Sequence, residues 1–98
     1  MKPIKVGNDE VAQWLAAMPA WSLLDGKLHR EYKFGDFAEA FGFMATCALV
    51  AQKADHHPEW FNVYSRVVVD LTTHDCGGVS ARDFALAAEM DKAALRYV

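Results

Sequence analysis

Apolar residues recur at helical spacing close to the start of the chain and predict a first helix. We expect Asn8 to be its N-cap, followed by Asp9 and Glu10 in the first turn, where the helix dipole favours acidic side chains. Pro19 ends this helix, because proline has no backbone N–H to donate. The apolar positions that define the periodicity are Val11, Trp14, Leu15 and Met18.

The next stretch alternates with the two-residue period of β-strands and predicts a hairpin over residues 21–24 and 27–34. The strands are joined by Asp25-Gly26, a dipeptide typical of tight hairpin turns. One side of the second strand is apolar and consists of Leu28, Tyr32 and Phe34. Its other side is polar and consists of His29, Glu31 and Lys33.

A long central helix is predicted next. Asp36 and Glu39 have the spacing of a capping box, with Asp36 as the N-cap. The helix should run to about Asp55, because His57 precedes Pro58 and is driven out of the helical region.

This helix carries two apolar stripes. Phe37, Phe41, Met44, Ala48 and Ala51 form the first, and Ala40, Phe43, Cys47, Val50 and Ala54 form the second. Together they cover more of the circumference than a single core face needs. The helix is either deeply buried, or it turns one stripe to the core and the other to a second copy of the chain. We favour self-association through the helix at residues 36–54, because a small domain has little protein available to cover both stripes.

A second pair of strands is predicted over residues 60–65 and 66–73, although no Gly or Asn marks the turn near Ser65. Val67, Val69 and Leu71 face one side of the later strand. After Gly77-Gly78, Ser80 caps a third helix. Its expected buried residues are Phe84, Leu86, Ala87, Met90, Ala94 and Leu95.

This order of elements predicts an α+β fold, in which a four-stranded antiparallel sheet has three helices packed on one face. The alternative is two separate hairpins, each of which would be marginally stable alone. A chain of 98 residues, 53% of them hydrophobic, suits a single domain over residues 1–98.

The composition argues against several classes of partner and site. The net charge of −3 gives no overall attraction to nucleic acid or to an anionic membrane. Cys47 and Cys76 are too few for a disulfide framework and have no zinc-ribbon spacing. The N-terminus lacks the apolar core of a signal peptide, and the longest apolar stretch is too short to span a bilayer, so we expect a cytosolic protein.

Three of the four histidines lie in two short segments, His56-His57-Pro58 and Thr72-Thr73-His74. Both segments fall at the ends of predicted elements, where functional side chains often lie. Histidine exchanges protons near neutral pH and therefore suits general acid/base catalysis.

Each of these features also has a structural interpretation. An adjacent histidine pair is often only a polar loop, and Asp83 stands three residues after Ser80, where it could complete a capping box. A metal site formed by His56, His57, His74 and Asp83 is conceivable, although it lacks the spacing of known zinc motifs. Trp60 would usually be a core residue, and beside a histidine pair it could instead stack on a flat ring.

Two motifs together resemble one enzyme family. The segments D-H-H-P-E-W-F-N-V-Y at residues 55–64 and T-H-D-C-G-G-V-S-A-R-D at residues 73–83 closely resemble pterin-4a-carbinolamine dehydratase, as does F-G-D-F-A-E-A-F-G-F-M at residues 34–44. The resemblance extends from about Trp21 to about Ala88. It implies the same α+β fold, with dimers or tetramers built through the central helix.

The implied activity is a carbon–oxygen lyase reaction that dehydrates 4a-hydroxytetrahydropterin to quinonoid dihydropterin. This reaction recycles tetrahydrobiopterin-type cofactors for aromatic amino acid hydroxylases, which are possible partners. The resemblance implies no metal and no organic cofactor, since the pterin is the substrate. In animals the family also supplies a dimerisation cofactor for a homeodomain transcription factor.

By position, the resemblance implies catalytic roles for His56, His57 and His74, with Asp83 as the supporting acid. The positions implied to line the pterin pocket are Asp55, Trp60, Thr72, Thr73 and Cys76. Gln52 stands one helical turn before His56, where family members often carry a glutamate. A neutral amide can still bond to a pterin edge, so this departure bears on pterin affinity and pH optimum and not on the reaction class.

We expect His56 and His74 to share the acid and base roles, while His57 orients the pterin ring. Asp83 would hold a histidine in the useful tautomer and favour its charged form. The competing hypothesis is an oligomeric binding module, which acts as a dimerisation cofactor or a pterin-pathway accessory protein, and the broad apolar helix supports it.

Overall fold

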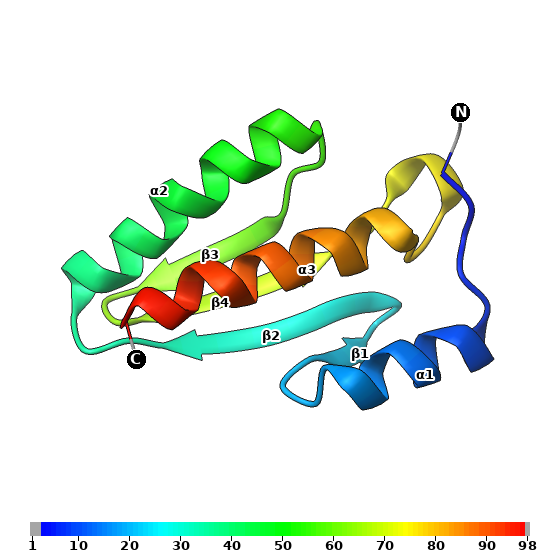
Figure 1. The fold of residues 1–98 in the computed structure, drawn as a ribbon, viewed down its shortest axis with the longest axis horizontal. Helices are drawn as coiled ribbons and strands as arrows, with labels where there is room; N and C mark the ends of the chain where they lie inside the picture. Colours follow the sequence, from blue (N-terminus) through cyan, green and yellow to red (C-terminus); the bar gives the residue numbers. More distant parts are fainter. Residues whose placement is uncertain (1–2, 98) are drawn as a thin grey trace.

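The computed structural model describes residues 3–97, and its elements follow the predicted order (Figure 1). They are α1 (Asn8–Ala17), β1 (Ser22–Leu24), β2 (Lys27–Lys33), α2 (Phe37–Ala54), β3 (Glu59–Val63), β4 (Arg66–Leu71), the short 3₁₀ helix η1 (His74–Cys76), α3 (Ala81–Ala94) and the 3₁₀ helix η2 (Leu95–Tyr97). None of the helices within these residues is long and apolar enough to cross a membrane.

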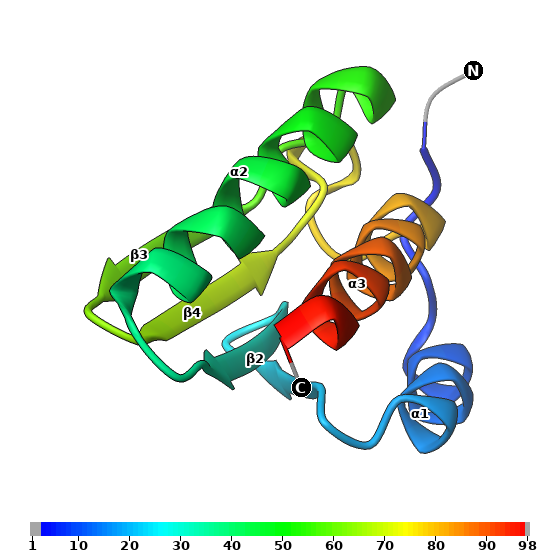
Figure 2. The same cartoon turned by 60° about the vertical axis from the view of Figure 1, so that its left-hand side comes forward.

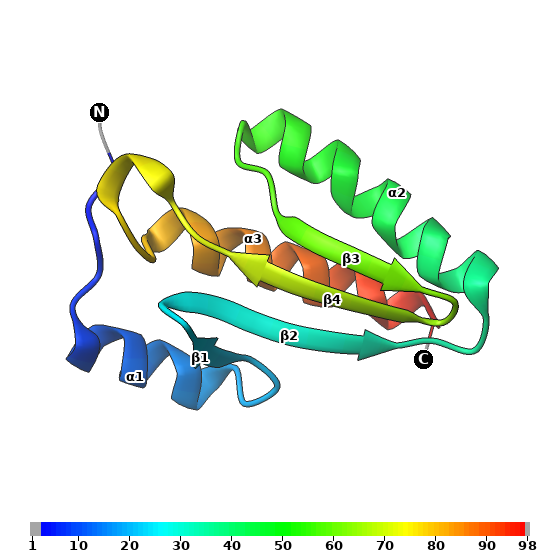
Figure 3. The ribbon, with the colours of Figure 1, turned by 180° about the vertical axis from the view of Figure 1, so that it is seen from behind.

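The four strands form one antiparallel sheet in the order β1-β2-β4-β3. The predicted α+β architecture is confirmed, and the alternative of two separate hairpins is wrong, because β2 pairs with β4 in the centre of the sheet. Helices α2 and α3 lie across one face of the sheet, and α1 packs beside α3 (Figure 2). No helix of residues 3–97 lies on the opposite face (Figure 3).

Cross-strand register places the apolar side chains on the helix-covered face. Leu28 lies opposite Leu71, and Tyr32 lies opposite Val67. All four are buried, as predicted from the alternation of the two strands. The other face carries charged side chains, and there ion pairs join Lys27 to Glu59, His29 to Asp70 and Arg66 to Glu31.

Two of the three predicted helix caps are confirmed. The Asp36 carboxylate accepts from the backbone N–H of Glu39, and Ser80 forms a complete capping box with Asp83. The prediction for the first helix is wrong by one residue. Gly7 is the N-cap of α1, because the N–H of Val11 already donates to the Gly7 carbonyl and draws Asn8 into the first turn.

The second hairpin is shorter than predicted. Its strands end at Val63 and Leu71, and Tyr64 and Ser65 make the turn between them. Tyr64 adopts a left-handed backbone with φ 52°, which is uncommon for a residue other than glycine. Tyr64 thus takes the left-handed position of the turn that Gly or Asn would usually occupy.

The two stripes of α2 have different surroundings. In the second stripe Ala40, Phe43 and Cys47 are buried against the sheet, although Ala54 is exposed. In the first stripe Phe37 and Phe41 keep 55% and 57% of their surface exposed. Ala51, which the pattern assigned to that stripe, is buried in the core. One stripe therefore serves the core, and the other is open to solvent in the single chain.

At the C-terminal end the prediction of a buried Leu95 is wrong. The chain tightens from α-helix to 3₁₀ helix at this residue, and the changed rotation leaves the Leu95 side chain exposed. The Tyr97 side chain packs against the core in its place. Its ring meets Phe34 edge-on, with ring centroids 5.6 Å apart.

One carboxylate holds α3 against the sheet. Asp91 accepts hydrogen bonds from the indole N–H of Trp21 at 3.0 Å, the hydroxyl of Tyr32 at 2.5 Å and the guanidinium of Arg30 at 2.7 Å. Burial raises the pKa of the Tyr32 phenol well above its usual value, and the bond to Asp91 adds to the shift.

The raised pKa of Tyr32 predicts a loss of stability in alkali. The folded state holds this proton more tightly than the unfolded chain, so the Tyr32 contribution to stability is constant below about pH 10 and then falls by at most about 1.4 kcal/mol per pH unit. Tyr32→Phe should reduce the slope measured by urea unfolding between pH 8 and pH 11, and the buried Cys47 thiol, whose pKa is also raised, should account for the slope that remains. The exposed Tyr64 is the control, and a Tyr64→Phe protein should keep the slope; its loss there would contradict the prediction.

Candidate active site

The end of α2 places its two following histidines in different surroundings. Asp55 closes the helix in a left-handed conformation with φ 52°, and the N–H of His56 bonds back to the carbonyl of Ala51 at 3.1 Å. After this reversal His56 is buried, while His57 is exposed and its Nε2 lies 3.2 Å from the Gln52 amide oxygen. Adjacent histidines thus meet different surroundings.

A closed loop after β4 carries the third histidine. The N–H of Thr73 donates to the Gly78 carbonyl at 2.8 Å, and Gly77 takes a left-handed conformation with φ 72° to turn the chain back. His74 begins η1 inside this loop, with 84% of its side chain exposed. The loop lies at the same end of the molecule as the last turn of α2 (Figure 1).

Asp83 lies beneath these segments with no exposed surface. Its Oδ1 lies 2.5 Å from Nε2 of His56. Its Oδ2 accepts from the Thr73 hydroxyl at 2.7 Å and from the Ser80 N–H at 2.9 Å. From the sequence, Asp83 could either complete the cap of α3 or contact a histidine. In the structure it does both, because Oδ2 accepts the capping bond from Ser80 and Oδ1 contacts His56.

The hydroxyl groups around Asp83 form a directed chain. Thr73 gives its single proton to Asp83, so the 2.7 Å contact between the Thr73 and Ser80 hydroxyls has Ser80 as the donor. The Ser80 oxygen in turn accepts from the backbone N–H of Arg82. With Asp83 ionised, Nε2 of His56 donates to it, and Nδ1 is the ring nitrogen left for a ligand.

These segments enclose a cavity of about 360 Å³, which we call the histidine cavity. Its volume lies in the usual range of small-molecule sites, roughly 300–1,000 Å³. The cavity is lined by Asp55, His56, His57, Pro58, Glu59, Thr72, Thr73, His74, Asp75 and Arg82. Three histidines that are up to 18 positions apart in the chain therefore face one hollow.

Four predicted site residues lie outside this lining. Asp83 is behind His56 and Thr73, and Gln52 reaches the cavity through His57. Trp60 is half-buried opposite Val69 on the helix-covered face, and it packs against the core. The Cys76 thiol lies within the loop, 3.5 Å from the Thr73 carbonyl and 3.4 Å from that of Gly78.

The residues that sequence reasoning missed are Pro58, Glu59, Asp75 and Arg82. Each is adjacent to a residue that was selected, so closeness in the chain could have suggested all four. Arg82 also borders a cavity of about 270 Å³ between α2 and α3, which His56 lines as well.

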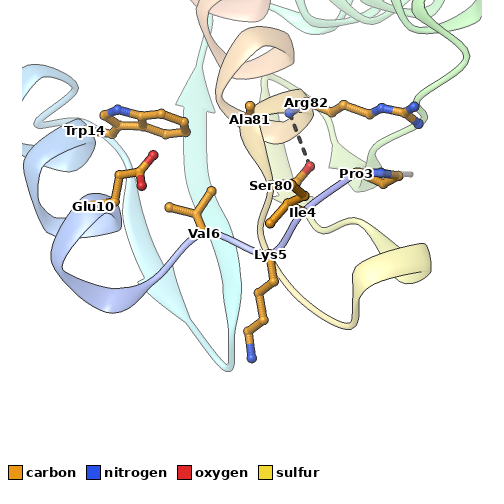
Figure 4. A pocket seen from close by; sticks show the side chains of 9 residues that line it. All are labelled: Pro3, Ile4, Lys5, Val6, Glu10, Trp14, Ser80, Ala81 and Arg82. Carbon is orange, nitrogen blue, oxygen red and sulfur yellow. Dashed lines mark hydrogen bonds between the residues drawn. The ribbon is translucent and has the colours of Figure 1, made fainter. Parts of the chain in front are cut away.

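A larger hollow of about 420 Å³ lies on the other side of the first turn of α3. Figure 4 shows it between the N-terminal segment, Trp14 and the Ser80–Arg82 turn. Its lining is mainly apolar and contains no histidine, so its larger volume does not make it the better candidate for proton transfer.

The metal alternative has no geometric support. Within residues 3–97, no three His, Cys, Asp or Glu side chains are grouped so that they could hold a metal ion. Both cysteines are free, and burial raises the pKa of the Cys47 thiol to about 12.

The family comparison covers the part of the chain that contains the histidine segments. The family model described as pterin 4 alpha carbinolamine dehydratase matches residues 4–93. The chain belongs to this family. A relative from Solibacter usitatus, provisionally named a pterin-4-alpha-carbinolamine dehydratase, is 56% identical over 87 residues, which cover 89% of this chain and 92% of the relative.

Solved structures agree with the family assignment. A protein from Brucella melitensis described as a transcriptional coactivator/pterin dehydratase has 46% identity and a TM-score of 0.88, and the match covers 92% of this chain and 98% of that one. A pterin dehydratase-like RuBisCO assembly factor of the α-carboxysome has a TM-score of 0.63 at 21% identity, covering 76% of this chain and 86% of that one. This second likeness concerns the fold alone.

Substitutions at Asp83 and Ser80 separate the capping bond from the other contacts of the carboxylate. Ser80→Ala removes the capping hydroxyl and should lower the free energy of unfolding by about 1 kcal/mol. Asp83→Ala also leaves buried His56 and Thr73 without their acceptor, so we expect a loss of about 3–5 kcal/mol in urea unfolding. The solvent-exposed cap of α2 is the control, and Asp36→Ala should cost about 1 kcal/mol. Equal losses for Asp83→Ala and Asp36→Ala would show that the buried contacts contribute little.

Proposed function

We propose that this protein dehydrates 4a-hydroxytetrahydropterins to quinonoid dihydropterins by histidine acid/base catalysis. The observation that supports the proposal is the arrangement of His56, His57 and His74 around one cavity, in a chain of the pterin-4a-carbinolamine dehydratase family. No organic cofactor enters this proposal, because the pterin itself is the substrate.

The proposed reaction needs two proton transfers at neighbouring atoms. An acid protonates the 4a-hydroxyl as its C–O bond breaks, so that the group leaves as water. A base takes the proton from the adjacent ring nitrogen, and the electron pair of that N–H bond forms the new C=N bond. Two histidines of opposite protonation state can perform both transfers near pH 7, and each transfer is typically worth about 10²–10⁴-fold in rate.

The surroundings of the histidines support a division of roles. Asp83 fixes the ring of His56, so its Nδ1 has a defined position and tautomer for proton exchange. His74 is open to water, which can restore its protonation state after each turnover. His57 is held by the neutral Gln52 amide, and this contact suits a residue that orients the pterin ring.

The remaining predicted pocket residues divide into two groups. Asp55 and Thr72 line the histidine cavity and are proposed to contact the pterin. Thr73 uses its hydroxyl on Asp83, so we propose that it maintains the polar chain under the site. Trp60 and Cys76 lie outside the lining, and we propose that they support the cavity wall and the loop around His74.

Rate measurements on synthetic 4a-hydroxytetrahydropterin test the catalytic assignment. His56→Ala and His74→Ala should each lower kcat by about 10²–10⁴-fold. His29→Ala is the matched control, because His29 also pairs with an aspartate but lies on the helix-free face of the sheet. Near-wild-type rates in both site variants, or an equal loss in the control, would show that the acid/base assignment is wrong.

A second proposal concerns assembly. Phe37, Phe41 and Leu49 leave 55%, 57% and 75% of their surfaces exposed on α2, an apolar area that suits a protein interface. We propose that α2 joins copies of the chain into a homodimer or homotetramer. The same face could serve the alternative function, a dimerisation cofactor or accessory module for a partner such as an aromatic amino acid hydroxylase.

Sedimentation of the free protein tests this assembly. Phe41→Glu places a charge within the exposed part of α2 and should lower the sedimenting mass to that of one chain at micromolar concentration. Phe61→Glu makes the same change on the opposite face of the sheet, where Phe61 is 54% exposed, and should leave the mass unchanged. If only Phe61→Glu dissociates the protein, the interface lies on the sheet and not on α2.

A further inference from the structure

His74 stands between two hollows. One is the histidine cavity, and the other is a space of about 300 Å³ bordered by the β1–β2 turn. The second hollow is lined by Asp25, Gly26, Lys27, Thr72, His74, Gly77 and Gly78. With 84% of its side chain exposed, the His74 ring has room to turn toward either side. Only the orientation toward the histidine cavity would serve the proposed function.

The charges on the two sides are not equal. Glu59 lines the histidine cavity, and its Oε2 lies 3.7 Å from Nε2 of His74. Lys27 lines the other hollow, but its ammonium contacts Oε1 of Glu59. A carboxylate attracts an imidazole that carries or shares a proton. The attraction to Glu59 therefore favours the orientation toward the histidine cavity.

Lys27 also holds Glu59 in place. Its ammonium donates to Oε1 of Glu59 at 2.6 Å, and this hydrogen bond is the main cause of a raised Lys27 pKa. The other carboxylate oxygen remains free to face His74. Both residues begin strands, since Lys27 is the first residue of β2 and Glu59 the first of β3, so their backbones are fixed by the sheet.

Other charged groups also line the two hollows. Asp55, Asp75 and Arg82 line the histidine cavity, and Asp25 lines the other hollow. The ion pair within 4.0 Å that His74 makes among the described residues is the one with Glu59.

From this geometry we infer that Glu59 is a positioning residue, which turns the His74 ring toward the histidine cavity while Lys27 anchors the Glu59 carboxylate. The inference rests on the proposed function for its catalytic consequence. The orientation of the ring is a separate, directly measurable property. Sequence reasoning had selected neither Glu59 nor Lys27.

The first test measures the His74 side chain itself and requires no substrate. Three-bond NMR couplings about its Cα–Cβ bond should show one dominant rotamer in the native protein. Glu59→Gln removes the charge at nearly the same volume. It should lower the population ratio of the dominant His74 rotamer to the others by about three- to fivefold, as expected for the loss of an exposed ion pair. Lys27→Met should produce a smaller change of the same kind.

Glu31→Gln is the matched control, because the Glu31–Arg66 pair is similarly exposed on the same face of the sheet. This variant should leave the His74 couplings unchanged. Unchanged couplings in Glu59→Gln, or equal changes in both glutamine variants, would overturn the inference.

Kinetics provide the second test. Glu59→Gln should lower kcat for the 4a-hydroxytetrahydropterin by about three- to fivefold with little change in KM, since the proposed loss concerns proton transfer and not pterin binding. In a His74→Ala background the same substitution should have no further effect on kcat. An additive loss would overturn the inference. If the native protein showed no dehydration, the proposed function would fail, whereas the NMR result would still decide whether Glu59 positions His74.

Discussion

The buried carboxylate of Asp83 is the constraint on which the rest of the site depends. It joins three segments that are distant in the chain, because it accepts from Ser80 at the start of α3, from Thr73 after β4 and from His56 after α2. A carboxylate without exposed surface is costly unless its oxygens are fully hydrogen-bonded. The three segments must therefore meet at this point whenever the chain folds, and the histidine cavity forms above them.

The layered fold separates the proposed functions in space. The histidine cavity is lined by residues where α2 ends and by residues of the loop that follows β4. Figures 1 and 2 show these two segments near one end of the molecule. The exposed apolar residues of α2 lie along the side of that helix. A partner could contact α2 along this side, because the core uses the other stripe of the same helix.

Much of the fold follows from interactions between residues close in sequence. The Asp25-Gly26 turn, the caps at Asp36 and Ser80, and the alternation of Val67, Val69 and Leu71 each depend on a few neighbouring positions, and all were predicted. Some errors are themselves local, such as the shift of the α1 cap from Asn8 to Gly7, and one occurs where a distant contact overrides the local pattern. Leu95 is apolar and has the helical spacing of the buried residues of α3, but its side chain is exposed and Tyr97 fills the space beside Phe34.

The sequence by itself determined which residues could carry the chemistry, because the histidine segments and the Ser80–Asp83 spacing are local patterns with few alternatives. The tertiary structure decided how those residues lie relative to one another. It showed that Asp83 both caps α3 and contacts His56, that Glu59 lies beside His74, and that Trp60 packs against the core. The physical reason is that a cap or a turn is closed within a few bonds of backbone. A cavity wall, in contrast, is made by segments whose positions are fixed only when the sheet and helices pack.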